Sequence, residues 1–288
     1  MDVIFRQSSE PSGRENTVNG RVALLPGSLT MNSLIGYTGF VGGNLLAQRQ
    51  YDGVYNSANF SELRGKHFRR LVCAGISAKK WIANKNPEED WEKIAALVDV
   101  LKTTTANKFV LISTIDVYAS TQKLDESFDC HGIPNHAYGT NRLRFEEFCR
   151  THFSHCQIVR LPGLFGAGLK KNVIFDLMND NCLEMINPKS SFQYYDLDNL
   201  SDDLERIDQT DIPVINFFTE PIFTSDIIDR FFPGKPVGMQ SAPEAHYDLR
   251  TKYAPLWGKT GCYCYSQEEI FAQLERFIEK TCSSEKKE

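Results

Sequence analysis

Three residues near the middle of the chain have the types and spacing of a proton-transfer site. Tyr138 opens a predicted helix in YGTNR, and Arg142 lies four residues later on the same helical face. A phenol with a pKa of about 10 is a weak base at neutral pH, and a neighbouring cation favours its phenolate. Thr114 follows the apolar run FVLIS and could hold a substrate oxygen beside that phenol. Together the three groups suit hydride chemistry at a carbon that bears oxygen.

A glycine cluster far upstream supplies a second, separate signal. In LIGYTGFVGGNLL, Gly36, Gly39 and Gly42 are spaced G-x-x-G-x-x-G between a strand pattern and a helix expected from residue 40 to 49. Glycines alone could mean only a tight turn. A helix N-terminus offers free N–H groups and partial positive charge, so this context favours a dinucleotide pyrophosphate. Thr38 and Phe40, inside the motif, are expected to contact the same cofactor.

The elements that must position these residues alternate between strand and helix patterns. Strands are expected in SLI, GVY, RRLVCAG, KFVLIST, QIVRLPG and PVINFF, with helices over about 87–105, 138–150 and 225–232. Asn86, Pro87 and three acidic residues mark the start of the first of these helices, and Ser266 with Glu269 forms a capping box for a last amphipathic helix. Alternation of this kind predicts an α/β fold, a Rossmann-like doubly wound parallel sheet, and the looser pattern after about residue 168 predicts a small C-terminal lobe.

The pattern also divides the chain. Residues 1–30 are polar and without sustained periodicity, so we expect a disordered leader, with the folded unit beginning at Met31. Residues 31–168 are expected to form the NAD(P)-binding domain. Residues 169–288 are expected to form the substrate-binding lobe and to return in part to the sheet.

Composition excludes several other classes of function. The chain has 288 residues and a formal net charge of -5, with scattered lysines and arginines, so nucleic acid is not an expected partner. No apolar run approaches membrane-spanning length and no secretory signal is evident, which favours a soluble cytoplasmic protein without a membrane partner. The eight cysteines show no disulfide framework. The cluster CRTHFSHC would place Cys149, His152 and Cys156 on one face only if its helix continued through Cys156, so no metal site is expected.

At this level the chain resembles the extended short-chain dehydrogenases/reductases, of the NAD-dependent epimerase/dehydratase type that modifies nucleotide sugars. The resemblance covers residues 31–168 and rests on the glycine motif, on LISTIDVYAS, on Tyr138 and on IVRLPGLFGAG. It implies Tyr138 as acid/base and Thr114 as the hydrogen-bonding hydroxyl. For the cofactor it implies Ala74 and Gly75 after a central strand, and Pro162 near the nicotinamide. It also implies a nucleotide-sugar substrate, for which Asp116, Asn172 and Arg250 are the candidate contacts, and the fold analogy favours a homodimer.

Three departures from the family pattern leave alternatives open. Arg142 stands where the family has lysine, and it could supply charge and ribose hydrogen bonds with a different geometry. Asn56 stands where an acidic residue would hold the adenosine ribose, so the cofactor could be NAD or NADP. Ile115 separates Thr114 from Asp116, which argues against dehydration. We therefore expect an epimerase or reductase, and the alternative is a non-catalytic NAD(P)-binding sensor or scaffold on the same fold.

Overall fold

A six-stranded, wholly parallel sheet forms the centre of the molecule. The computed structural model describes residues 31–285, and within them the strand order is β2-β1-β3-β4-β5-β9. The strands are β1 (Asn32–Ile35), β2 (Gly53–Tyr55), β3 (His67–Cys73), β4 (Thr105–Thr114), β5 (Cys156–Leu161) and β9 (Val214–Asn216). The predicted Rossmann-like α/β class is confirmed.

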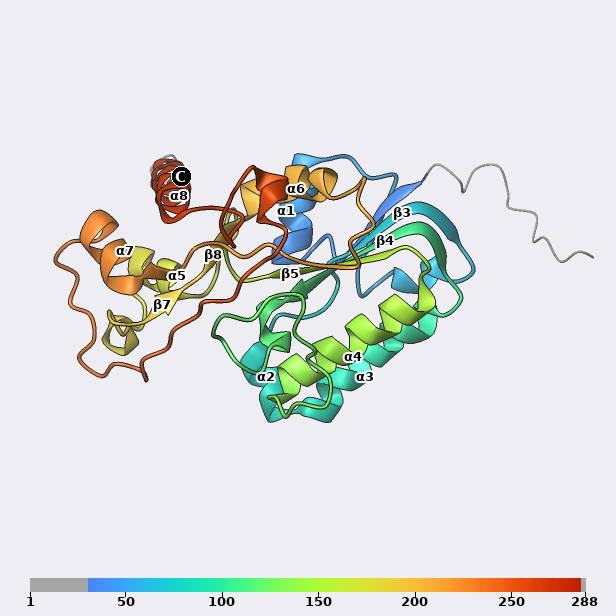
Figure 1. Ribbon diagram of the computed structural model, residues 1–288, viewed down its shortest axis with the longest axis horizontal. Coiled ribbons are helices and arrows are strands. Elements are labelled where there is room, and N and C mark those ends of the chain that lie inside the picture. Colours follow the sequence, from blue (N-terminus) through green and yellow to red (C-terminus); the bar gives the residue numbers. More distant parts are fainter. Residues whose placement is uncertain (1–30, 286–288) are drawn as a thin grey trace, which may run out of the picture.

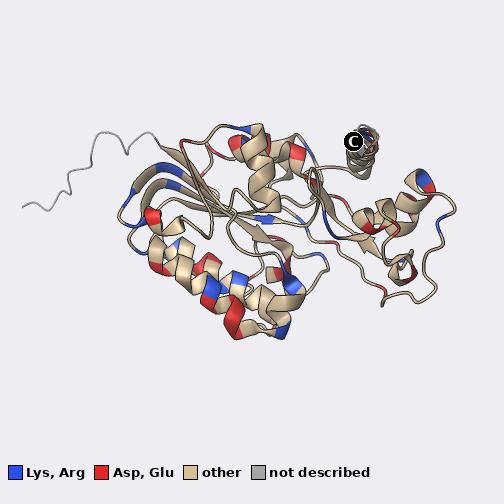
Figure 2. Cartoon of the chain, turned by 180° about the vertical axis from the view of Figure 1, so that it is seen from behind, with Lys and Arg blue, Asp and Glu red and all other residues tan. Residues whose placement is uncertain are grey.

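Helices cover both faces of this sheet (Figure 1). The long helices α3 (Pro87–Leu101) and α4 (Ala137–His152) pack together on one face, and α1 (Phe40–Gln48) and α6 (Leu200–Arg206) lie on the other. Each face has its own apolar core: Phe109 belongs to the core beneath α3 and α4, whereas its strand neighbour Val110 belongs to the core beneath α1 and α6. Strands buried on both sides are apolar at successive positions, which explains the run FVLI in β4. Acidic and basic residues are interspersed along the outer surfaces of α3 and α4 (Figure 2).

The order of the strands creates one point where a ligand crevice can open. The chain passes from β1 to β2 on one side and then crosses to β3 on the other side of β1. Connections that leave in opposite directions separate at the carboxyl ends of β1 and β3, where open α/β sheets bind their ligands. The glycine turn between β1 and α1 lies at this position.

The chain after residue 168 both extends and completes the sheet. Strand β9 pairs with β5 as the last strand of the sheet. Most of the remaining elements gather at one end of the molecule around a third apolar core (Figure 1): β7 (Ser191–Phe192), β10 (Ile222–Phe223), α5 (Val173–Met178), α7 (Thr224–Phe231) and α8 (Gln267–Glu285), with β8 (Tyr194–Asp196) and the earlier strand β6 (Gly163–Phe165) leading into them. Helix α8 begins at the predicted capping box, in which Ser266 N donates to Glu269 Oε2 at 2.8 Å and Glu269 N donates to Ser266 Oγ at 3.4 Å.

The structure differs from the sequence expectations at one helix end and in one additional helix. Helix α3 ends at Leu101 instead of near Thr105, because Thr104 turns inward and its hydroxyl donates to Leu63 O at 3.0 Å. A short helix, α2 (Lys80–Lys85), occupies part of the segment that follows β3. The expected leader at residues 1–30 lies outside the described residues. Among residues 31–285, no helix combines the length and apolar character that crossing a membrane requires.

Candidate active site

Two glycines of the first turn are required by contacts within the protein itself. Gly36 has φ +90, and a Cβ there would lie 2.4 Å from Ala74 O at the end of β3. A Cβ on Gly42 would lie 2.1 Å from Gly36 O. The turn can therefore press against β3, and α1 can close on the turn, only where these side chains are absent. Gly39 is less constrained, since its Cβ would approach Gly36 O at 3.3 Å.

The N-terminus of α1 is left open for an anion. Its N-cap residue, Gly39, offers no capping side chain, and the first turn contains no acidic residue. By contrast, α4 and α5 are capped by the side chains of His136 and Asn172. Gly39 and Thr38 are exposed, so the start of α1 is accessible at the switch point of the sheet. This arrangement fits the pyrophosphate of a dinucleotide.

The structure brings Tyr138, Arg142 and Thr114 together as the sequence predicted. The guanidinium carbon of Arg142 lies 4.0 Å from the centroid of the Tyr138 ring. Burial raises the pKa of Tyr138, and this effect outweighs the opposing influences of the Arg142 charge and of the nearby Thr114 hydroxyl. The phenol is therefore protonated at neutral pH in the free protein, ready to donate a proton.

Arg142 is held by partners that the sequence did not reveal. Its Nη2 donates to Asp90 Oδ1 at 3.0 Å and to Ser77 O at 2.5 Å, and its Nη1 pairs with the other oxygen of Asp90. Only 5% of the Arg142 side chain and 10% of the Asp90 side chain are exposed. Asn141 Nδ2 also donates to Asp90, at 2.9 Å. The guanidinium is thus locked beneath the phenol, and a contact between Arg142 and the ribose stays a prediction.

A second polar group lies beside the phenol, centred on Asp116. Lys80 Nζ is 2.6 Å from Asp116 Oδ1, and His136 Nε2 is 3.6 Å from the same oxygen. Burial would raise the pKa of Asp116, but the neighbouring His136 ring and the charge of Lys80 bring it below its usual value. His136 Nδ1 accepts from Gly139 N at 3.0 Å, so the proton of the neutral ring is on Nε2, facing Asp116. Asp116 is therefore an ionised acceptor at the mouth of the site.

Close packing fixes the start of α4 against the end of β4. A Cβ on Gly139 would lie 2.1 Å from Asp116 O, so the YG dipeptide lets the helix touch this segment. Asn84 Oδ1 on α2 accepts from Tyr138 N at 2.8 Å. Further along α4, Glu146 accepts from Arg160 of β5 and from Ser113 of β4. These bonds set the position of Tyr138 relative to Thr114, the neighbour of Ser113.

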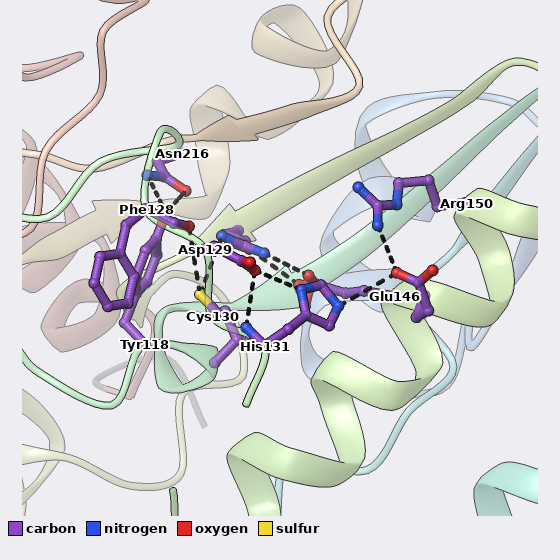
Figure 3. Close-up of polar contacts among 12 residues, drawn as sticks. Tyr118, Phe128, Asp129, Cys130, His131, Glu146, Arg150 and Asn216 are labelled. Carbon is purple, nitrogen blue, oxygen red and sulfur yellow. Dashed lines mark hydrogen bonds and ion pairs between the residues drawn. The ribbon is translucent and has the colours of Figure 1, made fainter. Parts of the chain in front are cut away.

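The Glu146–Arg160 pair belongs to a larger polar cluster that includes Tyr118 and Asn216 (Figure 3). Arg160 Nη2 lies 2.6 Å from Glu146 Oε2, and its guanidinium carbon is 4.9 Å from the centroid of the Tyr118 ring. Asn216 Nδ2 donates to Tyr118 OH at 2.9 Å. Burial raises the pKa of Tyr118 to about 12. The cluster connects β5, β9 and the segment after β4, and we interpret its role as structural.

The remaining predicted residues have varied settings. Pro162 is buried directly after β5. Asn56, after β2, is occupied in a turn, where its Oδ1 accepts from Ala58 N at 2.8 Å. Asn172 caps α5 and donates to Leu164 O at 2.9 Å. Arg250 pairs with Asp248 at 3.2 Å. The roles of these residues toward a cofactor or substrate stay predictions.

Two residues from the C-terminal half reach the same site without having been predicted. Lys171 Nζ donates to Ala78 O at 2.5 Å in the segment after β3, and it lies within electrostatic range of Asp116. Burial lowers the pKa of Lys171. Tyr247 lies within range of both Lys80 and Asp116, and burial raises its pKa. Neither residue has a local sequence signal, because the fold alone brings it near Asp116. No group of three or more His, Cys, Asp or Glu residues between 31 and 285 is arranged to hold a metal ion.

No protein-family model matches the sequence, and a comparison with curated proteins finds no match. Solved structures do match. UDP-glucose 4-epimerase from Thermotoga maritima, with UDP-glucose, has a TM-score of 0.68 at 14% identity, covering 88% of this chain and 98% of that one. dTDP-4-dehydrorhamnose reductase from Bacillus anthracis, in complex with NADP, has a TM-score of 0.68 at 16% identity, with coverages of 88% and 99%. UDP-N-acetylglucosamine 4-epimerase from Methanobrevibacter ruminantium, with UDP-N-acetylmuramic acid, has a TM-score of 0.69 at 13% identity, with coverages of 88% and 99%. The chain therefore has the fold that these nucleotide-sugar epimerases and this reductase share.

Proposed function

We propose that the chain is an NAD(P)-dependent epimerase or reductase that acts on a nucleotide sugar or a similar polyol. The observation that carries the proposal is the placement of Tyr138 beside Thr114 and above the Arg142 guanidinium, at the carboxyl edge of the sheet that also bears the open N-terminus of α1. The similarity to solved nucleotide-sugar enzymes supports the class of substrate.

Each protein group has a distinct task in this reaction. The N–H groups at the start of α1 bind the pyrophosphate, and the nicotinamide, when bound, accepts or returns hydride. Tyr138 exchanges a proton between its phenol oxygen and the substrate oxygen, while the Thr114 hydroxyl orients that oxygen. The fixed Arg142 charge beneath the ring favours the phenolate that forms when Tyr138 gives up its proton.

The cluster around Asp116 supplies the substrate contacts. An ionised carboxylate accepts hydrogen bonds and donates none, so Asp116 favours a substrate hydroxyl at this position. Lys80 and Lys171 place positive charge near Asp116, which suits the anionic nucleotide portion of the substrate. Arg250 is a further candidate for that portion if it leaves Asp248.

Two observations favour the non-catalytic alternative. The net effect on the Tyr138 pKa is upward, and the Arg142 charge is compensated by Asp90. A protein with the same fold that binds NAD(P) without turnover would show both features. The two functions differ in turnover and agree in cofactor binding.

The test uses the full chain with NAD or NADP and a panel of UDP- and dTDP-linked hexoses. Epimerised sugars, or the keto sugars that a reductase forms in the reverse direction with NAD or NADP as hydride acceptor, are detected by chromatography, because an epimerase returns its hydride and leaves no net absorbance change. Tyr138→Phe should lower turnover about 10²- to 10⁴-fold, the usual contribution of a positioned acid/base. Tyr253→Phe is the matched control, since no hydrogen bond of the Tyr253 hydroxyl is found within the described chain, and it should keep full activity.

Cofactor binding without turnover across the panel would favour the sensor. Full activity of Tyr138→Phe would remove Tyr138 from the mechanism. Absence of binding to both NAD and NADP would contradict the enzyme and the sensor alike.

A further inference from the structure

A cavity of about 280 Å³ opens at the amino ends of the strands, on the edge of the sheet opposite to the candidate active site. It lies among the start of β1, the middle of β3, the first half of β4, the end of α6 and the segments that follow α1 and α6. We call it the amino-edge cavity. Its charged lining consists of Arg49, Arg69, Arg70, Lys108, Glu205 and Asp208. Figure 2 shows basic segments on neighbouring strands at this end of the sheet.

Positive charge in the amino-edge cavity exceeds negative charge. Four cationic side chains against two acidic ones leave a net charge of +2. Arg49 pairs with Glu205, so that cation is matched. Arg70 and Lys108 share one carboxylate, since Arg70 Nε and Lys108 Nζ lie 3.2 Å and 3.4 Å from the same Oδ1 of Asp208. The side chains of Arg70 and Lys108 are only 15% and 18% exposed, so water solvates their charges poorly.

Burial makes this shared arrangement costly for the cations. Desolvation lowers the pKa of both Arg70 and Lys108, and the attraction of Asp208 does not offset it. Arg70 Nε is buried without hydrogen-bond geometry to any partner in the described chain. Tyr51, which also lines the cavity, is largely buried, and its hydroxyl makes no hydrogen bond within residues 31–285. A dianion would compensate the charge and accept from these donors.

A purely structural role accounts for only some of these groups. Arg70 Nη2 donates to Leu204 O at 3.3 Å, and Lys108 Nζ donates to Asp208 O. Both cations therefore satisfy backbone carbonyl groups at and just after the C-terminus of α6. A guanidinium has five N–H donors and an ammonium has three. Further donors of Arg70, together with the Tyr51 hydroxyl, therefore remain available.

We propose that the amino-edge cavity binds a small phosphomonoester, with the phosphate in the cavity accepting hydrogen bonds from Arg70, Lys108 and the Tyr51 hydroxyl. The volume is at the low end of small-molecule sites, which suits one phosphate on a compact organic group and not a dinucleotide. The site is distinct from the glycine turn at the opposite edge, and the proposal does not rest on the proposed enzymatic function.

The test is a calorimetric titration of the full chain with inorganic phosphate, with sulfate and with glycerol 3-phosphate at constant ionic strength. We expect saturable binding, tighter for the ester. Lys108→Met should weaken it about tenfold or more, as expected for loss of a charge-assisted contact. Tyr51→Phe, which preserves the packing, should weaken it severalfold. The control Lys93→Met, at an exposed lysine paired with Glu89, should bind as the wild type does.

The outcomes discriminate between sites and sources. Binding that both Lys108→Met and Tyr51→Phe leave unchanged would place the anion elsewhere, for instance at the start of α1, and would overturn the proposal. Equal weak binding of phosphate and sulfate would indicate an adventitious ion only and would also overturn it. If Lys108→Met failed to fold, the Tyr51→Phe titration alone would decide.

Discussion

The buried pair of Asp90 and Arg142 can be tested by replacing one partner at a time. In Asp90→Asn the Arg142 guanidinium keeps its charge but loses the carboxylate that compensates it, in a place where only 5% of the side chain is exposed. Breaking a buried ion pair in this way costs about 3–5 kcal/mol. We expect the free energy of unfolding to fall by about 3 kcal/mol, which for a chain of this length corresponds to a fall in Tm of roughly 6–12 °C.

The assay is urea unfolding of the full chain, with a double-mutant cycle. Arg142→Met alone leaves Asp90 buried and unpaired, so it should also destabilise strongly. The double variant removes both charges and should lose less than the sum of the single losses, by at least about 1 kcal/mol. Glu89→Gln is the matched control on the same helix: its partner Lys93 is 67% exposed, so we expect a change below about 0.5 kcal/mol.

Two results would refute this reasoning. A loss in Asp90→Asn as small as that of Glu89→Gln would mean that the guanidinium finds water or another partner without cost. Strictly additive losses in the cycle would mean that the two side chains do not interact.

Two further variants test other parts of the fold. Gly42→Ala should destabilise the protein and weaken NAD(P) binding, because the added Cβ would lie 2.1 Å from Gly36 O. In the control Gly43→Ala the nearest atom to the added Cβ is 3.6 Å away, so this variant should be neutral or stabilising in thermal unfolding. Equal effects of the two substitutions would contradict the packing argument. Burial raises the pKa of Asp196 to about 6 from an ordinary value of 3.8, so its contribution to stability is complete below about pH 4 and is lost as pH rises through 6. Asp196→Asn should therefore be more stable than the wild type at pH 8. In urea unfolding, the free energy of unfolding of the wild type should fall between pH 4 and 6, and that of the variant should fall less. An unchanged pH profile would show that the carboxyl titrates normally.

The sequence predicted the parts of the site whose signals are local. Gly36 and Gly42 are marked by their spacing between a strand and a helix, and Tyr138 and Arg142 by one helical turn. The strand pattern around Phe109 predicted the sheet, because a strand covered on both faces must be apolar on both.

The parts that were missed depend on contacts between distant segments. Asp90 was interpreted as an acidic residue at a helix start, and nothing near it indicates that it meets Arg142, 52 residues away. Lys171 and Tyr247 come to the cleft from the C-terminal half, where short strands and turns carry little periodicity. Helix α2 has only six residues and no capping side chain, so no local signal separates it from a loop.

The central claim is that one edge of the sheet joins a dinucleotide at the start of α1 to the phenol of Tyr138. The most direct measurement is a crystal structure of the protein with NAD or NADP. We predict the pyrophosphate against the N–H groups that follow Gly39 and the nicotinamide ribose or ring within hydrogen-bond distance of the Tyr138 hydroxyl. A cofactor bound away from α1, or a nicotinamide that does not reach Tyr138, would contradict the account.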